Sequence, residues 1–220
     1  MKKKEQVQEP TVEIQPIEYE TQAIEETANV LFKPNPGPQT DFLAAAEREV
    51  LYGGSAGGGK SYAMLSDPLR YMGHPAFSGL LLRHTTEELR ELVFKSQELY
   101  PKIWPGIKWS ERKMQWTAPS GARLWMSYLD RDDDVLRYQG LAFSWIGFDE
   151  LTQWASPYAW NYMRSRLRST APDLPIYMRA TTNPGGRGHH WVKKMFIDPA
   201  PYNRAYDATD IETGEVLRYP

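Results

Sequence analysis

The chain has 220 residues, of which 41% are hydrophobic and 25% are charged, and it contains no cysteine. This length supports one main domain with a single core rather than two large domains. The lack of cysteine excludes disulfides and cysteine-based zinc sites, and it fits a reducing cytoplasmic setting. Glutamates and polar residues follow the first lysines, so no signal peptide is predicted, and no stretch reaches transmembrane length.

The net charge is −2, which is not the basic balance of a protein that binds nucleic acid through its overall field. The charge is unevenly distributed along the sequence. Residues 1–30 contain three Lys and seven Glu, whereas residues 160–194 contain five Arg and two Lys against a single Asp. The second segment predicts either a basic surface for DNA or a subunit, or an ordinary surface of paired arginines.

The first part of the chain is expected to be an N-terminal arm over residues 1–33, to which no secondary structure is assigned. A stiff, proline-rich connector follows at residues 33–39. A helix is predicted over Phe42–Arg48, with Thr40 or Asp41 as its capping residue.

A glycine-rich segment, Gly53–Ser61, fits the phosphate-loop pattern G-x-x-x-x-G-K-[ST] from Gly54 onward. A strand over Glu49–Tyr52 precedes it, and a helix from about Gly59 to Met72 follows it, which is the context that the motif requires. The alternative interpretation is a glycine-rich turn before a helix.

In such a loop, backbone N–H groups surround phosphate oxygens, and the start of the helix adds its positive end. Lys60 would reach the β- and γ-phosphates, and the Ser61 hydroxyl would bind Mg²⁺. The predicted nucleotide-binding residues of this segment are Gly54, Ser55, Ala56, Gly57, Gly58, Gly59, Lys60, Ser61 and Tyr62.

A second β-α unit follows the phosphate loop. It consists of a strand over residues 78–83 and a helix that Thr85 caps and that Pro101 ends. Residues 113–117 and 122–128 then flank Pro-Ser-Gly and predict a β-hairpin.

Two acids follow the next apolar strand, which is predicted over residues 141–148. At the end of a buried strand, Asp149 would hold Mg²⁺, and Glu150 would face the place where water attacks the γ-phosphate. Taken alone, the two acids also fit the cap of a following helix.

A helix is predicted over Pro157–Arg168, and a strand over residues 176–181 follows it. Ligands of parallel α/β sheets lie beyond the carboxyl ends of the strands, so Thr182 and Asn183 would touch the γ-phosphate or the attacking water. The alternative is a simple Asn-Pro-Gly turn. A last hairpin is predicted over residues 206–219.

These elements predict an α/β fold with a mainly parallel central sheet, flanking helices and an inserted β-hairpin. An acid that activates water is unsuitable in a small-molecule kinase, which must exclude water from the phosphate. The paired acids therefore favour an ATPase.

Four segments together resemble the ATPase domain of the tailed-phage terminase large subunit, the motor that packages DNA into procapsids. They are an adenine-contacting Q motif at Pro36–Leu43, the Walker A loop, a Walker B region at Tyr138–Glu150, and a coupling region within Arg166–Val192. The resemblance covers residues 34–198 and implies an ASCE-type P-loop NTPase fold. It places the ATPase domain at residues 34–200.

The resemblance also implies roles for single residues. Gln39 would contact adenine, Glu150 would be the catalytic acid, and Thr182 with Asn183 would couple phosphate loss to movement. Two family features are missing, because the loop has no arginine and Gln139 stands at the position of the arginine finger. Arg137 is the first candidate for the finger and Arg166 or Arg168 the second, with a plain surface role as the alternative for each.

The partners implied by the resemblance are ATP and Mg²⁺, double-stranded DNA, the portal protein and procapsid, and the terminase small subunit. Copies would form a ring when working and a monomer in isolation, in the host cytoplasm. A nuclease domain is expected to be missing, so residues 201–220 would begin a linker to it. Two alternatives stay open: a non-hydrolysing, nucleotide-dependent assembly switch, and a helicase-like DNA translocase of another family.

Overall fold

The computed structural model describes residues 32–54, 57–199, 201, 204, 206–209 and 216–219. Nearly all of the expected N-terminal arm, residues 1–33, lies outside these ranges, as do Ser55 and Ala56 of the phosphate loop.

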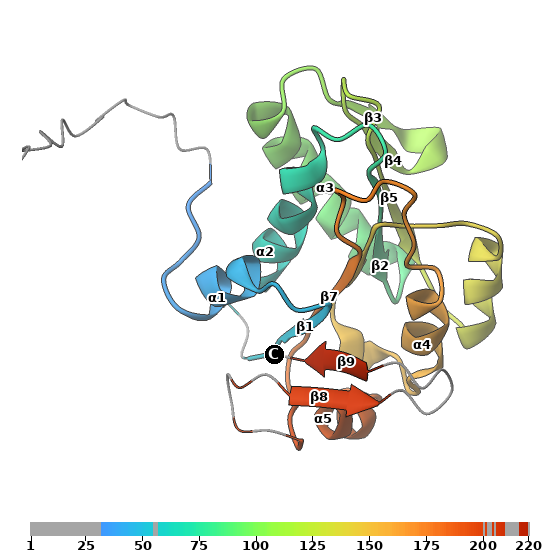
Figure 1. Cartoon of the computed structure of the whole chain (residues 1–220). Helices are drawn as coiled ribbons and strands as arrows, with labels where there is room; N and C mark the ends of the chain where they lie inside the picture. Colours follow the sequence, from blue (N-terminus) through green and yellow to red (C-terminus); the bar gives the residue numbers. More distant parts are fainter. Residues whose placement is uncertain are drawn as a thin grey trace, which may run out of the picture. The chain divides into compact units, whose positions relative to one another are not determined.

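A seven-stranded sheet forms the centre of the fold, with the strand order β1-β7-β6-β2-β5-β4-β3 (Figure 1). The strands are β1 (Glu49–Tyr52), β2 (Ser78–Arg83), β3 (Lys108–Ser110), β4 (Gln115–Thr117), β5 (Arg123–Tyr128), β6 (Trp145–Phe148) and β7 (Tyr177–Thr181). The first five strands in the order run parallel; β4 then pairs antiparallel with β5, and β3 pairs antiparallel with β4. The predicted mainly parallel α/β fold is therefore confirmed, and the predicted hairpin extends the same sheet.

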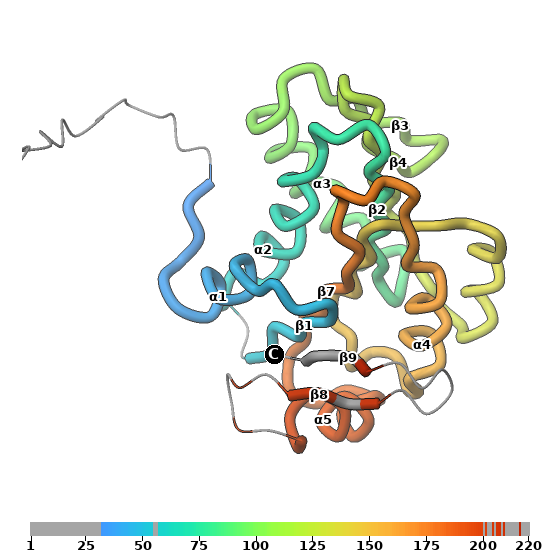
Figure 2. The backbone as a smooth tube through the Cα atoms, in the orientation of Figure 1, coloured from blue at the N-terminus to red at the C-terminus, as the bar shows by residue number. Residues whose placement is uncertain are grey.

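Helices cover both faces of this sheet. The α-helices are α1 (Pro38–Ala44), α2 (Lys60–Ser66), α3 (Thr86–Ile103), α4 (Tyr158–Arg164) and α5 (His189–Phe196). Short 3₁₀ helices are η1 (Asp67–Tyr71), η2 (Glu111–Lys113), η3 (Asp132–Tyr138) and η4 (Leu151–Gln153). In Figure 2, α2 and α3 lie on one side of the central strands and α4 on the other.

Successive side chains of β2 point to alternate faces of the sheet, which explains why two separate hydrophobic cores form. Leu81 packs with residues of α1, α2 and α3, whereas Leu80 and Leu82 pack with residues of η3, α4 and α5. Successive strand residues point to opposite faces, so a run of leucines is buried on both sides.

The two helices on either side of the phosphate loop differ from the predicted ones, the first in both of its ends and the second in its helix type after Ser66. The first helix begins at Pro38 and ends at Ala44, because Pro38 is preset for the first turn and Gly37 precedes it with φ of 89°. The helix after the loop is α-helical only to Ser66. Pro68 lacks an N–H donor, and the chain continues as the 3₁₀ helix η1.

The later helices differ at their C-termini. Thr85 caps α3 in a capping box with Glu88, as predicted, but the helix continues past Pro101 to Ile103. The helix predicted over Pro157–Arg168 ends at Arg164, because Leu167 forms a bridge with Phe143.

At the C-terminal end, β8 (Tyr206–Thr209) and β9 (Val216–Tyr219) form a two-stranded antiparallel sheet. None of the helices in the described ranges has the length and hydrophobicity that a membrane span needs.

Candidate active site

The carboxyl ends of β1, β7 and β6 meet at one edge of the sheet because these strands are parallel neighbours. The phosphate loop follows β1, Asp149 and Glu150 follow β6, and Thr182 and Asn183 follow β7. A hydrogen bond of 3.1 Å from Thr182 N to Tyr52 O joins two of these ends. The structure thus brings the predicted phosphate, metal and water groups to a single edge, as expected for an α/β sheet.

The phosphate loop is held by side chains from both of its flanks. Lys60 Nζ donates to Gly54 O over 3.0 Å, and the Tyr52 hydroxyl donates to Gly58 O over 2.6 Å. Gly54 has φ of 129° and Gly59 has φ of 75°, which are values that favour glycine. Lys60, although cationic, is buried here.

Gln39 packs against this loop. Its Nε2 donates to Gly59 O over 2.8 Å, and its Oε1 accepts from Asn35 N over 2.6 Å. A Cβ at Gly59 would lie 2.6 Å from Gln39 Nε2, so glycine is needed for the close approach. The predicted Q motif and the predicted phosphate loop are therefore in direct contact.

The first turn of α2 carries two predicted ligands. Ser61 is half-buried there, and Tyr62 is exposed with Lys95 Nζ 6.0 Å from the centre of its ring.

Asp149 is fully buried between two neighbouring strands. Its Oδ2 lies 2.9 Å from Arg83 Nε, and the Thr181 hydroxyl donates a hydrogen bond to its Oδ1. Burial raises the pKa of Asp149 above its ordinary value, and Arg83 and Thr181 act in the opposite direction. Arg83 and Thr181 were not predicted as site residues; each is the last residue of a buried strand that ends at this edge.

Glu150 has a left-handed backbone, with φ of 61°. Its Oε2 accepts from Asn183 N over 3.0 Å and its Oε1 from Asn183 Nδ2 over 2.7 Å. Its own N–H donates to Thr181 Oγ1 over 3.2 Å. A left-handed conformation in a non-glycine residue is strained and occurs often at functional sites, and here two neighbours fix the carboxylate.

Thr182 has a different neighbour from Asn183. Its hydroxyl lies 2.7 Å from Thr152 Oγ1, so it contacts η4 rather than the Glu150 carboxylate. Thr152 O also accepts from Gly188 N over 2.8 Å, and a Cβ at Gly188 would lie 2.0 Å from Trp154 O. The loop between β7 and α5 is thus packed directly on the 3₁₀ turn that follows Glu150.

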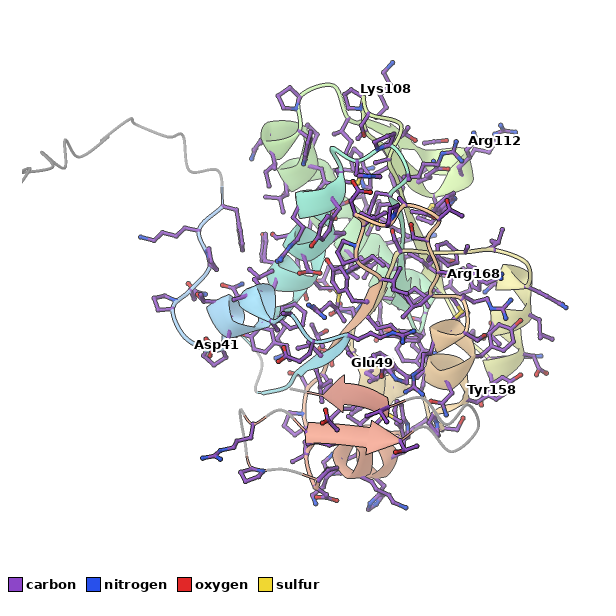
Figure 3. The ribbon with its side chains drawn as sticks, in the orientation of Figure 1. Asp41, Glu49, Lys108, Arg112, Tyr158 and Arg168 are labelled. Carbon is purple, nitrogen blue, oxygen red and sulfur yellow. The ribbon has the colours of Figure 1, made fainter. Side chains whose placement is uncertain are left out.

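Of the three candidates for an arginine finger, only Arg137 lies at the carboxyl ends of the strands, because it bonds Tyr128, which ends β5 and pairs with Arg83 at the end of β2. Arg137 donates to Tyr128 O over 2.7 Å, and its side chain is 47% exposed. The backbone of Phe143, just before the amino end of β6, donates to Arg166 O and accepts from Arg168 N, and Figure 3 labels Arg168. In the residues that the structure describes, none of the three forms a hydrogen bond or ion pair with Glu150.

The basic segment 160–194 is less basic at the surface than its composition predicts. Arg164 pairs with Glu49 at 2.5 Å, and Arg179 lies 3.9 Å from Asp67, with all four side chains buried. These two arginines are paired with acids, as the second interpretation expected, but the pairs are buried rather than on the surface, so they offer no charge to a partner.

The donor atoms at Asp149 fit Mg²⁺. Oδ2 accepts no hydrogen bond within the described chain although it is buried, so it keeps lone pairs for a metal or its water. A carboxylate and the Ser61 hydroxyl are the hard oxygen ligands that Mg²⁺ prefers, together with phosphates and water. No group of three or more His, Cys, Asp or Glu in the described ranges forms an alternative metal site.

Comparison with solved structures shows the same fold. The large terminase of a thermophilic bacteriophage, solved with ADP, is 18% identical, with a TM-score of 0.55, and the match covers 73% of this chain and 41% of that chain. The Thermus phage P74-26 large terminase ATPase domain is 14% identical, with a TM-score of 0.54 and coverage of 78% and 74%. The N-terminal domain of the DNA packaging ATPase of bacteriophage phi29 is 16% identical, with a TM-score of 0.55 and coverage of 84% and 95%.

The chain thus spans about two fifths of the large terminase solved with ADP. No curated protein sequence gives a significant match. The model of one protein family, described as "Terminase large subunit, T4likevirus-type, N-terminal", matches residues 51–213. This chain therefore belongs to the family of N-terminal domains of T4likevirus-type terminase large subunits.

Proposed function

We propose that the chain hydrolyses ATP and uses the energy to move double-stranded DNA into a viral procapsid, as the ATPase part of a terminase large subunit. The observation that carries the proposal is the meeting of a phosphate loop, a buried aspartate and a glutamate held by Asn183 at one sheet edge. Family membership and the packaging ATPases of the same fold support it.

Nucleotide binding would use the N–H groups of the loop, with Lys60 on the β- and γ-phosphates and Gln39 beside the adenine. Mg²⁺ would be held by Ser61 and Asp149, where it would neutralise developing charge on the phosphates. In this proposal the loop residues that bind the nucleotide are Gly54, Ser55, Ala56, Gly57, Gly58, Gly59, Lys60, Ser61 and Tyr62.

Glu150 would activate the attacking water. Its carboxylate accepts a proton from water as the water oxygen bonds to the γ-phosphorus and the bond from that phosphorus to the β-γ bridging oxygen breaks. The two hydrogen bonds from Asn183 would hold the carboxylate in place for this step. Catalysis would then be mostly positioning and charge stabilisation.

The contacts of Asn183 and Thr182 provide a route from chemistry to motion. Loss of the γ-phosphate would change the position of Glu150 and so of Asn183. Thr182 and Gly188 both form hydrogen bonds with Thr152. The 3₁₀ helix η4 and the loop that leads into α5 would therefore move together.

The finger arginine would come from a neighbouring subunit of a ring. Arg137 is the first candidate because its side chain is exposed on η3, and Arg166 and Arg168 are the second. The portal protein, the procapsid and the terminase small subunit are proposed partners on family membership, with the host cytoplasm as the place of action. Residues 201–220 would lead from the ATPase domain at 34–200 toward a nuclease domain.

DNA contact is proposed at the β3–β5 corner. Lys108 and Arg123 lie opposite Thr117 on either side of β4, so they point to the same side of the sheet. Lys113 and Arg112 follow on η2, and Figure 3 shows Lys108 and Arg112 at this end of the molecule. All four are exposed, and within the described ranges none forms an ion pair, unlike Arg164 and Arg179.

The ATPase rate, measured with and without double-stranded DNA across salt concentrations, tests the proposal. DNA should raise the rate, and the increase should vanish steeply with salt because phosphate contacts release counterions. ATP binding without turnover, in either condition, would favour the assembly switch. Equal stimulation by single-stranded DNA would favour a helicase-like translocase.

A further inference from the structure

We propose that Arg83 is a built-in counter-ion that makes metal binding at Asp149 depend on bound nucleotide. The inference rests on the proposed function for the nucleotide, but not on hydrolysis. It concerns a residue to which neither the motifs nor the family resemblance gives a role.

The position of Arg83 is fixed by the sheet. Arg83 ends β2, and its neighbour Leu82 lies opposite Phe148 of β6, so its side chain reaches Asp149 at the end of that strand. Both side chains are buried, and Arg83 Nε lies 2.9 Å from Asp149 Oδ2.

The contact is an ion pair without an aligned hydrogen bond. Arg83 Nε and Asp149 Oδ2 are both buried, and neither has a hydrogen-bond partner in the described chain. The charge of Asp149 is therefore neutralised while its Oδ2 lone pairs remain unused. A metal ion would find a donor atom with suitable chemistry but little net negative charge.

The formal charges of the site balance without any ligand. Lys60 and Arg83 contribute +2, and Asp149 and Glu150 contribute −2, which gives zero. On α3, Lys95 and Glu91 add a neutral pair, with 2.5 Å between Nζ and Oε1. A divalent cation alone would leave two excess positive charges in a poorly solvated site, and Coulomb repulsion opposes this.

A nucleotide changes this balance because its phosphates bring more negative charge than one Mg²⁺ neutralises. The metal and the nucleotide are then favoured together and the metal alone is not. Removing the positive charge of Arg83 should allow the metal to bind without nucleotide, since the net charge of the empty site would become negative.

Metal binding without nucleotide tests the proposal directly, with Mn²⁺ as the probe and free Mn²⁺ measured by electron paramagnetic resonance. Arg83→Gln should bind Mn²⁺ at least about tenfold more tightly than the wild type, because one nearby positive charge is gone. Arg83→Lys keeps the charge and should behave like the wild type. Arg70→Gln is the matched control, because Arg70 also pairs with a buried carboxylate, Asp67, at 3.0 Å, and should give no gain.

Two outcomes would overturn the proposal: an Arg83→Gln variant that binds Mn²⁺ alone no more tightly than the wild type, and an Arg83→Lys variant that binds it as tightly as Arg83→Gln although the charge is kept. If Arg83→Gln does not fold, wild-type protein still decides, since tight binding of Mn²⁺ in the absence of nucleotide would contradict a site that Arg83 has neutralised. A wild type that binds no ADP would contradict the proposed function and leave the nucleotide-free comparison intact.

Discussion

Two buried ion pairs lie at opposite ends of the strands of the same sheet, one at the amino ends and one at the carboxyl ends. They differ in their hydrogen bonds. At the amino edge, Glu49 accepts hydrogen bonds from Arg164 Nε at 2.5 Å, Arg164 Nη2 at 3.1 Å and Trp160 Nε1 at 3.0 Å. At the carboxyl edge, the Asp149 carboxylate accepts a hydrogen bond from the Thr181 hydroxyl, and within the described residues its contact with Arg83 is not an aligned hydrogen bond.

The difference predicts a structural role for the Glu49 pair and, in the proposed mechanism, a functional role for the Asp149 pair. Both oxygens of Glu49 accept hydrogen bonds, so this carboxylate fixes α4 to the start of β1. Asp149 is neutralised but keeps acceptor capacity, which buried groups rarely leave unused without a reason. Changes at the two edges should therefore affect different properties, stability at one and chemistry at the other.

The largest effect is expected for Glu150→Gln at the carboxyl edge. ATP turnover should fall about 10²- to 10⁴-fold, because the base that accepts the proton of water is lost. ADP affinity and the thermal melting temperature should stay close to those of the wild type. Near-normal turnover measured by phosphate release would remove Glu150 from the mechanism.

At the amino edge, Arg164→Met should act on stability instead. It leaves Glu49 buried without its cation, which should lower the free energy of unfolding by about 3–5 kcal/mol. Urea denaturation measures the loss, with Arg166→Met as a control that should stay within about 0.5 kcal/mol. If both variants were equally stable, Glu49 and Arg164 would not form a structural pair.

A smaller effect on turnover is expected for Asn183→Ala. The Glu150 carboxylate would lose its side-chain anchor, and misplacement of a catalytic group should reduce kcat by up to about 10²-fold. Thr182→Ser keeps the hydroxyl toward Thr152 and is the matched control in steady-state assays. Unchanged kcat in Asn183→Ala would show that the bond at 2.7 Å does not position the base.

The smallest effect is expected for exposed cationic side chains, which differ from the buried pairs in being accessible to DNA. Replacing Lys108, Arg112, Lys113 and Arg123 by Gln should lower the salt dependence of DNA binding, by about 0.9 in slope for each DNA phosphate that is no longer neutralised. The slope comes from fluorescence anisotropy with duplex DNA. Replacing Lys193 and Lys194 by Gln is the comparison for the 160–194 segment. A reduced slope in that variant alone would place DNA there instead.

Local sequence was sufficient for the elements whose signals are local. The phosphate loop, the strand that ends in Asp149 and the capping box of Thr85 depend on neighbouring residues, and so does the hairpin at residues 113–128.

Contacts between distant strands could not be predicted in the same way. The insertion of β7 between β1 and β6 places Asn183 beside Glu150 and Thr181 beside Asp149. Arg83 meets Asp149 only because β2 lies next to β6. Nor does a count of arginines reveal that Arg164 is buried against Glu49, since that pairing joins residues that are 115 positions apart.

The central claim is that this carboxyl edge binds the phosphates of a nucleotide with its metal. Isothermal titration calorimetry of ADP with Mg²⁺ tests it most directly, on the wild type and on Lys60→Ala. We expect clear binding by the wild type and at least about tenfold weaker binding by the variant, because a buried cation on the phosphates is lost. Equal affinity of the two proteins, or no binding by the wild type, would contradict the account.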